Sequence, residues 1–150
     1  MIAEIQAAIV ALRRYVPVVG VIGGMVGCFG GMSLAAALCS RLVMARQARL
    51  GMNGPEVIEQ EAGVEELDSR DRRLIWSMIG GEQRTAVGLA DTLVEDDTNQ
   101  VRDAVLSAFE RGVPASHRTE QVDAQLERLA RVDPSAIDPA VLRTLWQGDV

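Results

Sequence analysis

The sequence contains no lysine, only one histidine and two cysteines, and few aromatic residues. Aromatic side chains make up 3% of the 150 residues, too few to stack the bases of single-stranded nucleic acid or the face of a sugar. Cys28 and Cys39 cannot form a disulfide framework, and His117 has no second ligand at metal-binding spacing. We therefore expect no metal and no other cofactor, and we expect His117 to be a surface residue.

Signatures of catalysis are also missing from the sequence. It has no nucleophile elbow, and no lysine follows Gly80 and Gly81, so this pair cannot belong to a phosphate-binding P-loop. No carboxylate lies in the apolar part of the chain, where it could relay protons. The sequence therefore predicts no catalytic residue, and it predicts that the protein is not an enzyme.

Charge is distributed unevenly along the chain. All fifteen basic residues are arginine, and the formal net charge is −6. Residues 1–54 contain five arginines and one glutamate, a net charge of +4, whereas residues 55–150 contain ten arginines and twenty acidic residues, a net charge of −10. A domain this acidic repels both nucleic acid and anionic lipid. The charge therefore disfavours nucleic acid as a partner.

An uncharged window of 26 residues, Tyr15–Ser40, lies between arginines on both sides. As a helix it would extend for about 39 Å, more than the roughly 30 Å of hydrocarbon in a bilayer. The window predicts a single membrane-spanning helix that, with its extension, covers residues 15–50 and places the chain in a lipid bilayer. Because three arginines follow the window closely and two precede it, the positive-inside rule places the C-terminal domain on the cytoplasmic side.

Small residues recur every four positions inside this window. Gly23, Gly27, Gly31 and Ala35 would share one face of a helix, with Gly20 and Gly24 beside them. The stripe resembles the glycine zippers of self-associating membrane helices, in which small residues let two backbones approach closely. These six residues are the predicted helix-packing site, and Gly27→Leu is expected to separate the helices.

Two other interpretations of the window remain. It could be a core helix, although one of this length would need a large surrounding domain. Alternatively, Arg13 and Arg14 followed by an apolar run could begin a signal peptide, with residues 25–28 loosely resembling a lipoprotein cleavage site. That site lacks its usual leucine, and the segment before the apolar run is long and contains Glu4.

The rest of the chain is predicted to be helical, which gives an all-α fold. We expect an amphipathic helix over residues 1–14, a linker with a short helix over residues 51–69, and an acidic helical domain over residues 70–150. Within that domain, no segment alternates apolar and polar residues for long enough to predict a strand. Apolar spacing and capping residues predict helices at 55–62, 70–79, 86–93, 99–111, 119–131 and from Asp138 onwards, with a turn at 80–84.

Residues 72–113 resemble the three-helix part of a winged helix-turn-helix of the MarR-like kind. The resemblance is carried by Thr85-Ala86, Leu89-Ala90, Val101-Arg102, Ala104 and Arg111-Gly112. It implies that the second helix enters the major groove of DNA and brings Asn99, Gln100 and Arg102 to the bases. The sequence departs from the family at residues 95–97, which are acidic where phosphate contact needs arginine or lysine, and after Gly112, where a helical pattern replaces the wing.

These observations favour a membrane-anchored, self-associating structural subunit of an oligomeric assembly, channel or conduit. Phage ejection proteins, holin-like pores and secretion-machine subunits share this layout of one membrane helix and a small domain. Two alternatives come from other functional classes. One is a membrane-tethered DNA-binding regulator that uses residues 72–113, and the other is a monomeric membrane anchor that recruits a basic partner.

Overall fold

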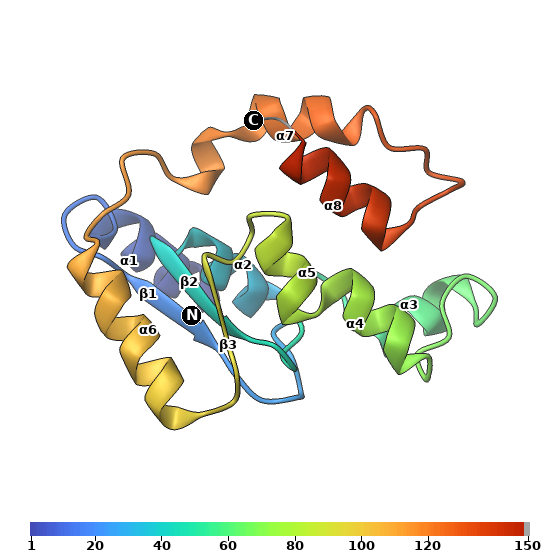
Figure 1. Cartoon of the computed structure of the whole chain (residues 1–150), viewed down its shortest axis with the longest axis horizontal. Coiled ribbons are helices and arrows are strands. Elements are labelled where there is room, and N and C mark those ends of the chain that lie inside the picture. The colour runs from blue at the N-terminus through green and yellow to red at the C-terminus, as the bar shows by residue number, and fades with distance from the viewer. Residues whose placement is uncertain (149–150) are drawn as a thin grey trace.

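The computed structural model describes residues 1–148 and is an α/β structure, so the all-α prediction is wrong. Its strands are parallel and its helices surround them (Figure 1). In chain order the elements are α1 (Ile2–Leu12), β1 (Val19–Ile22), α2 (Gly31–Leu38), β2 (Arg41–Ala45), α3 (Pro55–Ala62), α4 (Arg72–Ile79), α5 (Gly81–Ala86), β3 (Thr92–Val94), α6 (Thr98–Glu110), the 3-10 turn η1 (Arg118–Glu120), α7 (Val122–Leu129) and α8 (Pro139–Gln147).

The sheet has the order β1-β2-β3, with β2 in the centre. Val19 pairs with Arg41 at one end of the β1–β2 ladder, and Ala45 pairs with Val94 at the far end of the β2–β3 ladder. Helix α2 connects β1 to β2, and α3, α4 and α5 lie between β2 and β3 in the chain. The loops that follow the three strands therefore all begin at the same edge of the sheet.

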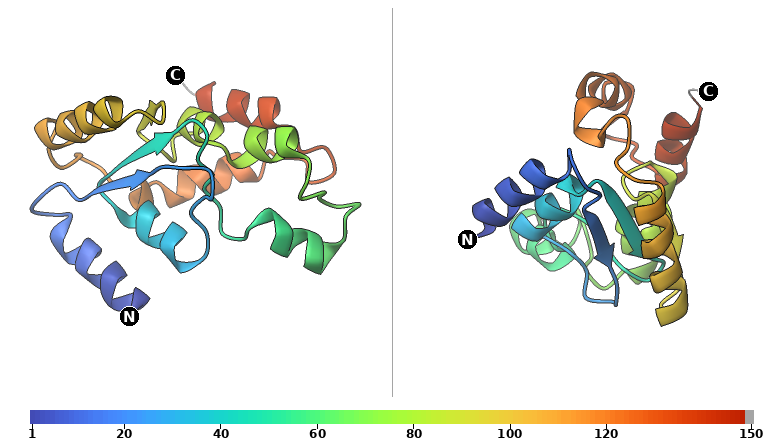
Figure 2. Two further views of the ribbon diagram at one scale, coloured as in Figure 1. Left: turned by 90° about the horizontal axis from the view of Figure 1, so that it is seen from below. Right: turned by 90° about the vertical axis from the view of Figure 1, so that its left-hand side faces the viewer.

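Helices cover both faces of this sheet. Helices α1 and α2 pack together on one face, while α6 lies along the other face in contact with all three strands (Figures 1 and 2). After α6 the chain turns back, and α8 packs against α5 (Figure 1). The C-terminal segment from η1 to α8 thus lies across the body of the domain.

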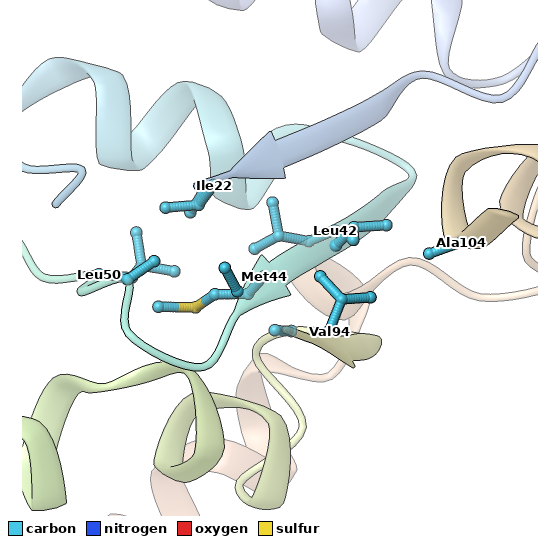
Figure 3. Close-up of a cluster of buried hydrophobic side chains, with 10 residues drawn as sticks. Ile22, Leu42, Met44, Leu50, Val94 and Ala104 are labelled. Carbon is cyan, nitrogen blue, oxygen red and sulfur yellow. The ribbon is translucent and has the colours of Figure 1, made fainter. Parts of the chain in front are cut away.

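The core surrounds β2, which is covered from both sides. Leu42, Val43, Met44 and Ala45 are each at most 1% exposed. Figure 3 shows Leu42 and Met44 among the surrounding core side chains. Fully burying a leucine, valine or methionine side chain stabilises a fold by roughly 1.5–3 kcal/mol. The remaining core side chains come from neighbouring elements: Ile22, Ala48, Leu50, Ala90, Val94 and Ala104.

The predicted membrane helix over residues 15–50 is wrong. Tyr15–Ser40 contains β1, a glycine-rich loop and α2, and no helix among residues 1–148 is long and apolar enough to cross a bilayer. The membrane localisation is therefore wrong, and the assignment of the C-terminal domain to the cytoplasmic side loses its basis. A strand and a short helix that are both covered by other layers carry as few charges as one membrane helix, which is why composition misled the prediction.

The strands escaped prediction because they are parallel and buried. A parallel strand with helices on both faces reads as a short continuous apolar run, without the alternation that marks a half-exposed strand. The helix predicted at 86–93 is wrong, because this stretch holds the end of α5, a turn and part of β3. The turn predicted at 80–84 is mostly helix α5. Helices α3, α4, α6, α7 and α8 coincide closely with the other predicted helices.

His117, expected on the surface, is buried at the C-terminal end of α2 with 8% of its area exposed. Its Nε2 donates to the carbonyl of Cys39 at 2.8 Å, and its Nδ1 accepts from the amide of Thr119 at 3.1 Å. Arg13 and Arg118 donate to carbonyls at the same helix end, at 2.7–2.9 Å. Carbonyls at a helix C-terminus carry partial negative charge, so these donors stabilise α2 and tie η1 to it.

We expect the stability of the protein to fall as pH falls below about 6.5, the ordinary pKa of histidine. Burial is the main cause that lowers the pKa of His117; the charges of Arg13 and Arg118 lower it further, while the hydrogen bond to the Cys39 carbonyl and the charge of Glu120 oppose this only in part. Because the unfolded chain then binds more protons than the folded one, stability is full above the ordinary pKa and is lost on acidification. Urea denaturation between about pH 7.5 and 5.5 should show a steeper decline in wild type than in His117→Gln, and equal slopes would contradict this account.

Candidate functional site

The candidate site is the glycine-rich loop at residues 23–30, between β1 and α2. It leaves the carboxyl end of β1, at the same edge of the sheet as the segment 46–54 after β2 and the segment 95–97 after β3. In open parallel sheets, ligands bind outside the carboxyl ends of the strands. The loop therefore lies where this type of fold places its functional groups.

Three glycines give the loop a backbone path that other residues rarely follow. Gly24, Gly27 and Gly30 have φ angles of 70°, 97° and 62°, in the left-handed half of conformational space. A side chain at such a position is strained whatever the space around it. At Gly27 a Cβ would also meet the Phe29 ring and, at 3.2 Å, the Cβ of Arg49. The glycines are thus needed for loop geometry.

The loop is fixed by backbone hydrogen bonds to the segment that follows β2. The amide of Cys28 donates to the carbonyl of Arg49 at 2.8 Å, and the amide of Gly51 donates to the carbonyl of Cys28 at 3.2 Å. The amide of Gly30 donates to the carbonyl of Met52 at 2.8 Å. These bonds hold the second half of the loop in place, so its conformation is set before any ligand arrives.

Arg49 fastens the middle of the loop. Its Nη2 donates to the carbonyl of Val26 at 2.7 Å. Its guanidinium lies 4.7 Å from the centroid of Trp76 and 5.5 Å from that of Phe29, and Arg72 approaches the same Trp76 ring at 5.1 Å. Each such cation–π contact contributes roughly 0.5–2 kcal/mol. This stack links the loop to α4.

The loop ends at the N-terminus of α2, with Gly30 as its capping residue. The first amides of a helix have no carbonyl partner inside it, and here these belong to Gly31 and Met32. Partial positive charge gathers at this end and favours an anion or a developing oxyanion. The loop and the helix end together offer backbone donors, with no cationic side chain required.

Side chains near the loop supply no evident nucleophile or metal site. Burial raises the pKa of the Cys28 thiol, which keeps it protonated and poorly nucleophilic near neutral pH. Within residues 1–148 no group of three or more histidine, cysteine, aspartate or glutamate side chains is placed to hold a metal ion. The chemistry that this arrangement favours is electrostatic stabilisation of negative charge by main-chain amides.

The six residues of the predicted helix-packing site lie in different elements. Gly20 is in β1, where a Cβ would meet Leu42 and Cys39, while Gly23, Gly24 and Gly27 are in the loop. Gly31 and Ala35 are in α2. A single stripe would need one continuous helix, which the structure does not contain over these residues. At Gly31 two helices of this chain do meet, because a Cβ there would lie 3.0 Å from Ile2 of α1.

The residues expected to contact DNA lie near the start of α6. Gln100 accepts from the amide of Glu95 at 3.0 Å, and Arg102 pairs with its neighbour Asp103 at 2.9 Å. Asn99 is exposed one residue before Gln100. Since α6 packs along the sheet and is preceded by β3, these residues belong to the α/β layer and not to an isolated three-helix unit.

The sequence analysis did not identify Arg49, Phe29 and Trp76 as site residues, because nothing in their spacing along the chain indicates that the three side chains meet. A signal for the loop itself was present. Glycines at 23, 24, 27, 30 and 31 follow a β-branched run ending at Ile22 and precede an alanine-rich segment, a pattern typical of a strand, a tight loop and a helix start. The spacing of four residues drew attention to a helix face instead.

Comparison with known proteins identifies enzymes as relatives, although no family model matches the sequence. A chain in the crystal structure of a Pseudomonas malonate decarboxylase hetero-tetramer in complex with malonate is 57% identical over 97% of this chain, with a TM-score of 0.93. A chain of a Pseudomonas malonate decarboxylase MdcD-MdcE hetero-dimer is 55% identical over 86%, with a TM-score of 0.76.

More distant similarities also involve carboxyl chemistry. The malonyl-S-ACP:biotin-protein carboxyltransferase MADC of Malonomonas rubra is 38% identical over 109 residues, which are 73% of this chain. A chain of transcarboxylase 12S is 28% identical over 70% of this chain, with a TM-score of 0.55. This chain spans 34% of the MADC sequence and about half, 53% and 52%, of the two malonate decarboxylase chains.

These findings correct several predictions. The relatives are enzymes, so the prediction of a non-enzyme is wrong. The resemblance of residues 72–113 to a MarR-like helix-turn-helix is wrong, and with it the DNA-binding regulator. The membrane structural subunit and the membrane anchor are wrong as well. Of the predicted partners, an oligomeric assembly agrees with the hetero-oligomeric relatives, whereas a lipid bilayer does not. The chain is thus similar, over nearly its whole length, to about half of a malonate decarboxylase subunit chain.

Proposed function

We propose that this chain forms part of an enzyme subunit that decarboxylates a malonyl thioester, and that the glycine-rich loop with the N-terminus of α2 stabilises the enolate formed. The observation that carries the proposal is the loop geometry: three glycines with positive φ lead into a helix start at the carboxyl edge of a parallel sheet. The substrate class is suggested by the relatives, whose names include malonate decarboxylase and malonyl-S-ACP.

The reaction needs a site for negative charge. When a malonyl thioester loses CO2, the bond between its carboxylate carbon and its α-carbon breaks, and the bonding electrons move into the thioester group. The thioester oxygen then carries the charge of an enolate until the α-carbon takes a proton from water, giving an acetyl thioester. Backbone donors fixed where that charge develops lower the barrier without having to reorganise.

Residues of this chain supply those donors in a fixed frame. In this proposal the thioester oxygen lies against the amides at the start of α2 and in the preceding loop, where the helix adds its own positive potential. Arg49 and the backbone bonds from residues 49–52 hold the donors in position. The carboxylate that leaves needs no cationic partner at this place, since neutralising it would oppose its loss as CO2.

Gly30→Ala is expected to lower kcat for malonyl-thioester decarboxylation about 100-fold, the typical effect of losing one oxyanion donor. Gly30 has φ 62° and ψ −143°, and a Cβ there would meet no atom within 4 Å. The substitution therefore acts only through the backbone and redirects the amide of Gly31. Activity would be measured as acetyl-thioester formation by the chain co-produced with the other subunits of a malonate decarboxylase complex.

Gly23→Ala is the matched control. A Cβ at Gly23 would also meet no atom within 4 Å, but the φ of this residue is not positive. Its kcat should stay within about twofold of wild type, because an exposed change without strain costs little. If Gly30→Ala assembles normally and keeps more than half of the wild-type kcat, the loop does not stabilise the enolate.

Carboxyl transfer is the second candidate reaction. It is favoured by the similarity to a malonyl-S-ACP:biotin-protein carboxyltransferase, and it also requires the enolate that the loop would stabilise. The two differ in where the carboxyl group goes. Release of labelled CO2 from carboxyl-labelled malonyl thioester without any acceptor protein supports decarboxylation, whereas label retained until a biotin protein is added supports transfer.

We also propose that the chain works in a hetero-oligomer, as its solved relatives do. Exposed apolar side chains support this. Val122 and Leu126 lie on one face of α7 and are each more than half exposed, at 53% and 57%. Contiguous exposed apolar surface is a common mark of a protein–protein contact. The assay above tests the assembly directly, because subunits that do not associate cannot be purified together.

A further inference from the structure

A cavity of about 400 Å³ lies between the C-terminal segment and the body of the domain, apart from the glycine-rich loop. Helices α7 and α8 form one side, and α5 with the turn after it forms the other (Figure 1). Its volume is in the range of small-molecule sites. The apolar lining is supplied by Met78, Val87, Leu89, Leu129, Leu142 and Trp146.

Most polar side chains that line the cavity already form hydrogen bonds within the protein. Arg118 donates to Asp91 and to carbonyls at the end of α2. Gln83 donates to the carbonyl of Pro139 and accepts from Arg143. The amide oxygen of Gln125 accepts from the Trp146 indole at 2.7 Å. None of these needs a ligand.

Arg84 differs from them. Its Nε donates to the carbonyl of Leu50 at 2.8 Å, and within residues 1–148 its guanidinium forms no ion pair. Burial lowers the pKa of this side chain, yet arginine stays charged at physiological pH. A half-buried guanidinium that lies beside an apolar cavity, with no ion pair among residues 1–148, is electrostatically complementary to a carboxylate that carries an apolar chain.

We propose that this cavity binds a medium-chain carboxylate or a similar acyl anion, with Arg84 holding the anionic group and the α7–α8 side holding the chain. The site is separate from the proposed enolate site, so either proposal can fail without the other. The cavity is connected to the glycine-rich loop only indirectly. Arg84 donates to the carbonyl of Leu50, which belongs to the segment whose backbone hydrogen bonds hold the loop.

The test is calorimetric titration of the full chain with octanoate and, in parallel, with 1-octanol, which has the same chain and no charge. Octanoate should bind wild type, and Arg84→Met should weaken octanoate binding at least tenfold while leaving 1-octanol binding unchanged. Arg102→Met removes one positive charge from an exposed side chain of α6, outside the cavity lining and without contact to it, and should leave both titrations unchanged.

A filling variant keeps the test decisive if Arg84→Met does not fold. Leu142→Trp places a larger side chain in the cavity and should abolish binding of both octanoate and 1-octanol with Arg84 intact. Trp146 lines the cavity, so octanoate should also change tryptophan fluorescence in wild type and not in Trp146→Phe. Absence of octanoate binding to wild type, or equal binding by Leu142→Trp, would overturn the proposal.

Discussion

Replacing Gly81 by alanine should lower the free energy of unfolding by about 3 kcal/mol or more, at the upper end of the cost of overpacking. Gly81 begins α5, and the start of this helix lies directly against the end of β2. A Cβ at Gly81 would collide with the carbonyl oxygen of Ala45 and lie 2.9 Å from its carbonyl carbon and 3.1 Å from the Cα of Arg46. Main-chain atoms of the central strand cannot move aside as a flexible side chain can.

Gly54→Ala is the control for this variant. Gly54 also lies at a helix start, before α3, and has φ −68°, but a Cβ there would only touch the flexible end of Glu56 at 3.5 Å. Its cost should stay within about 1 kcal/mol, the usual effect of losing a glycine cap. Urea denaturation followed by tryptophan fluorescence would compare the two. Equal midpoints for Gly81→Ala and Gly54→Ala would contradict the close packing of α5 on β2.

Gly27→Leu should abolish activity almost completely, with at least a roughly 1,000-fold loss of kcat, and should destabilise the fold by roughly 2–3 kcal/mol. Gly27 has φ 97°, so any side chain strains the backbone, and the first side-chain atom already meets Phe29 and Arg49. Leucine would push both away and release the contact of Arg49 with the Val26 carbonyl. The loop would then lose its position relative to α2.

Gly24→Leu distinguishes backbone strain from collision with neighbouring side chains as the cause of the loss in Gly27→Leu. Gly24 has φ 70°, and a Cβ there would project into open space, so the substitution introduces backbone strain without a collision. Its loss of stability should be the smaller of the two by about 1 kcal/mol, the lower bound for overpacking. Gly27→Leu should have both a lower melting temperature in thermal denaturation and a lower kcat in the decarboxylation assay than Gly24→Leu. If the two variants have equal melting temperatures and equal kcat, Arg49 and Phe29 do not hold the loop in position.

The sequence predicted that Gly27→Leu would separate two packed membrane helices, whereas the structure gives the substitution a different effect, distortion of the glycine-rich loop. A stripe of small residues was expected to bring two membrane helices together, and the structure instead uses the same glycines for a turn. Sequence spacing cannot distinguish these cases, because a helix face and a loop with positive φ both select glycine. The φ of Gly27 depends on where Arg49 and Phe29 are held, and contacts set that position.

Sequence alone determined several local features of this protein. Asp138 at a helix start placed α8, and apolar residues at helical spacing placed both α6 and α8, since caps and periodicity act over only a few neighbouring residues. The charge division between residues 1–54 and the rest was also evident, because it is a property of composition that folding does not change.

Only the tertiary structure decided the fold class and the site. β2 is recognisable as a strand because β1 and β3 pair with it and helices cover both its faces, and its own five residues are compatible with a helix just as well. The glycine-rich loop becomes a candidate site because Arg49 and Trp76 meet beside it from segments 27 residues apart in the sequence. Pairing between distant segments and burial in layers are properties of the folded chain, and a local pattern cannot encode them.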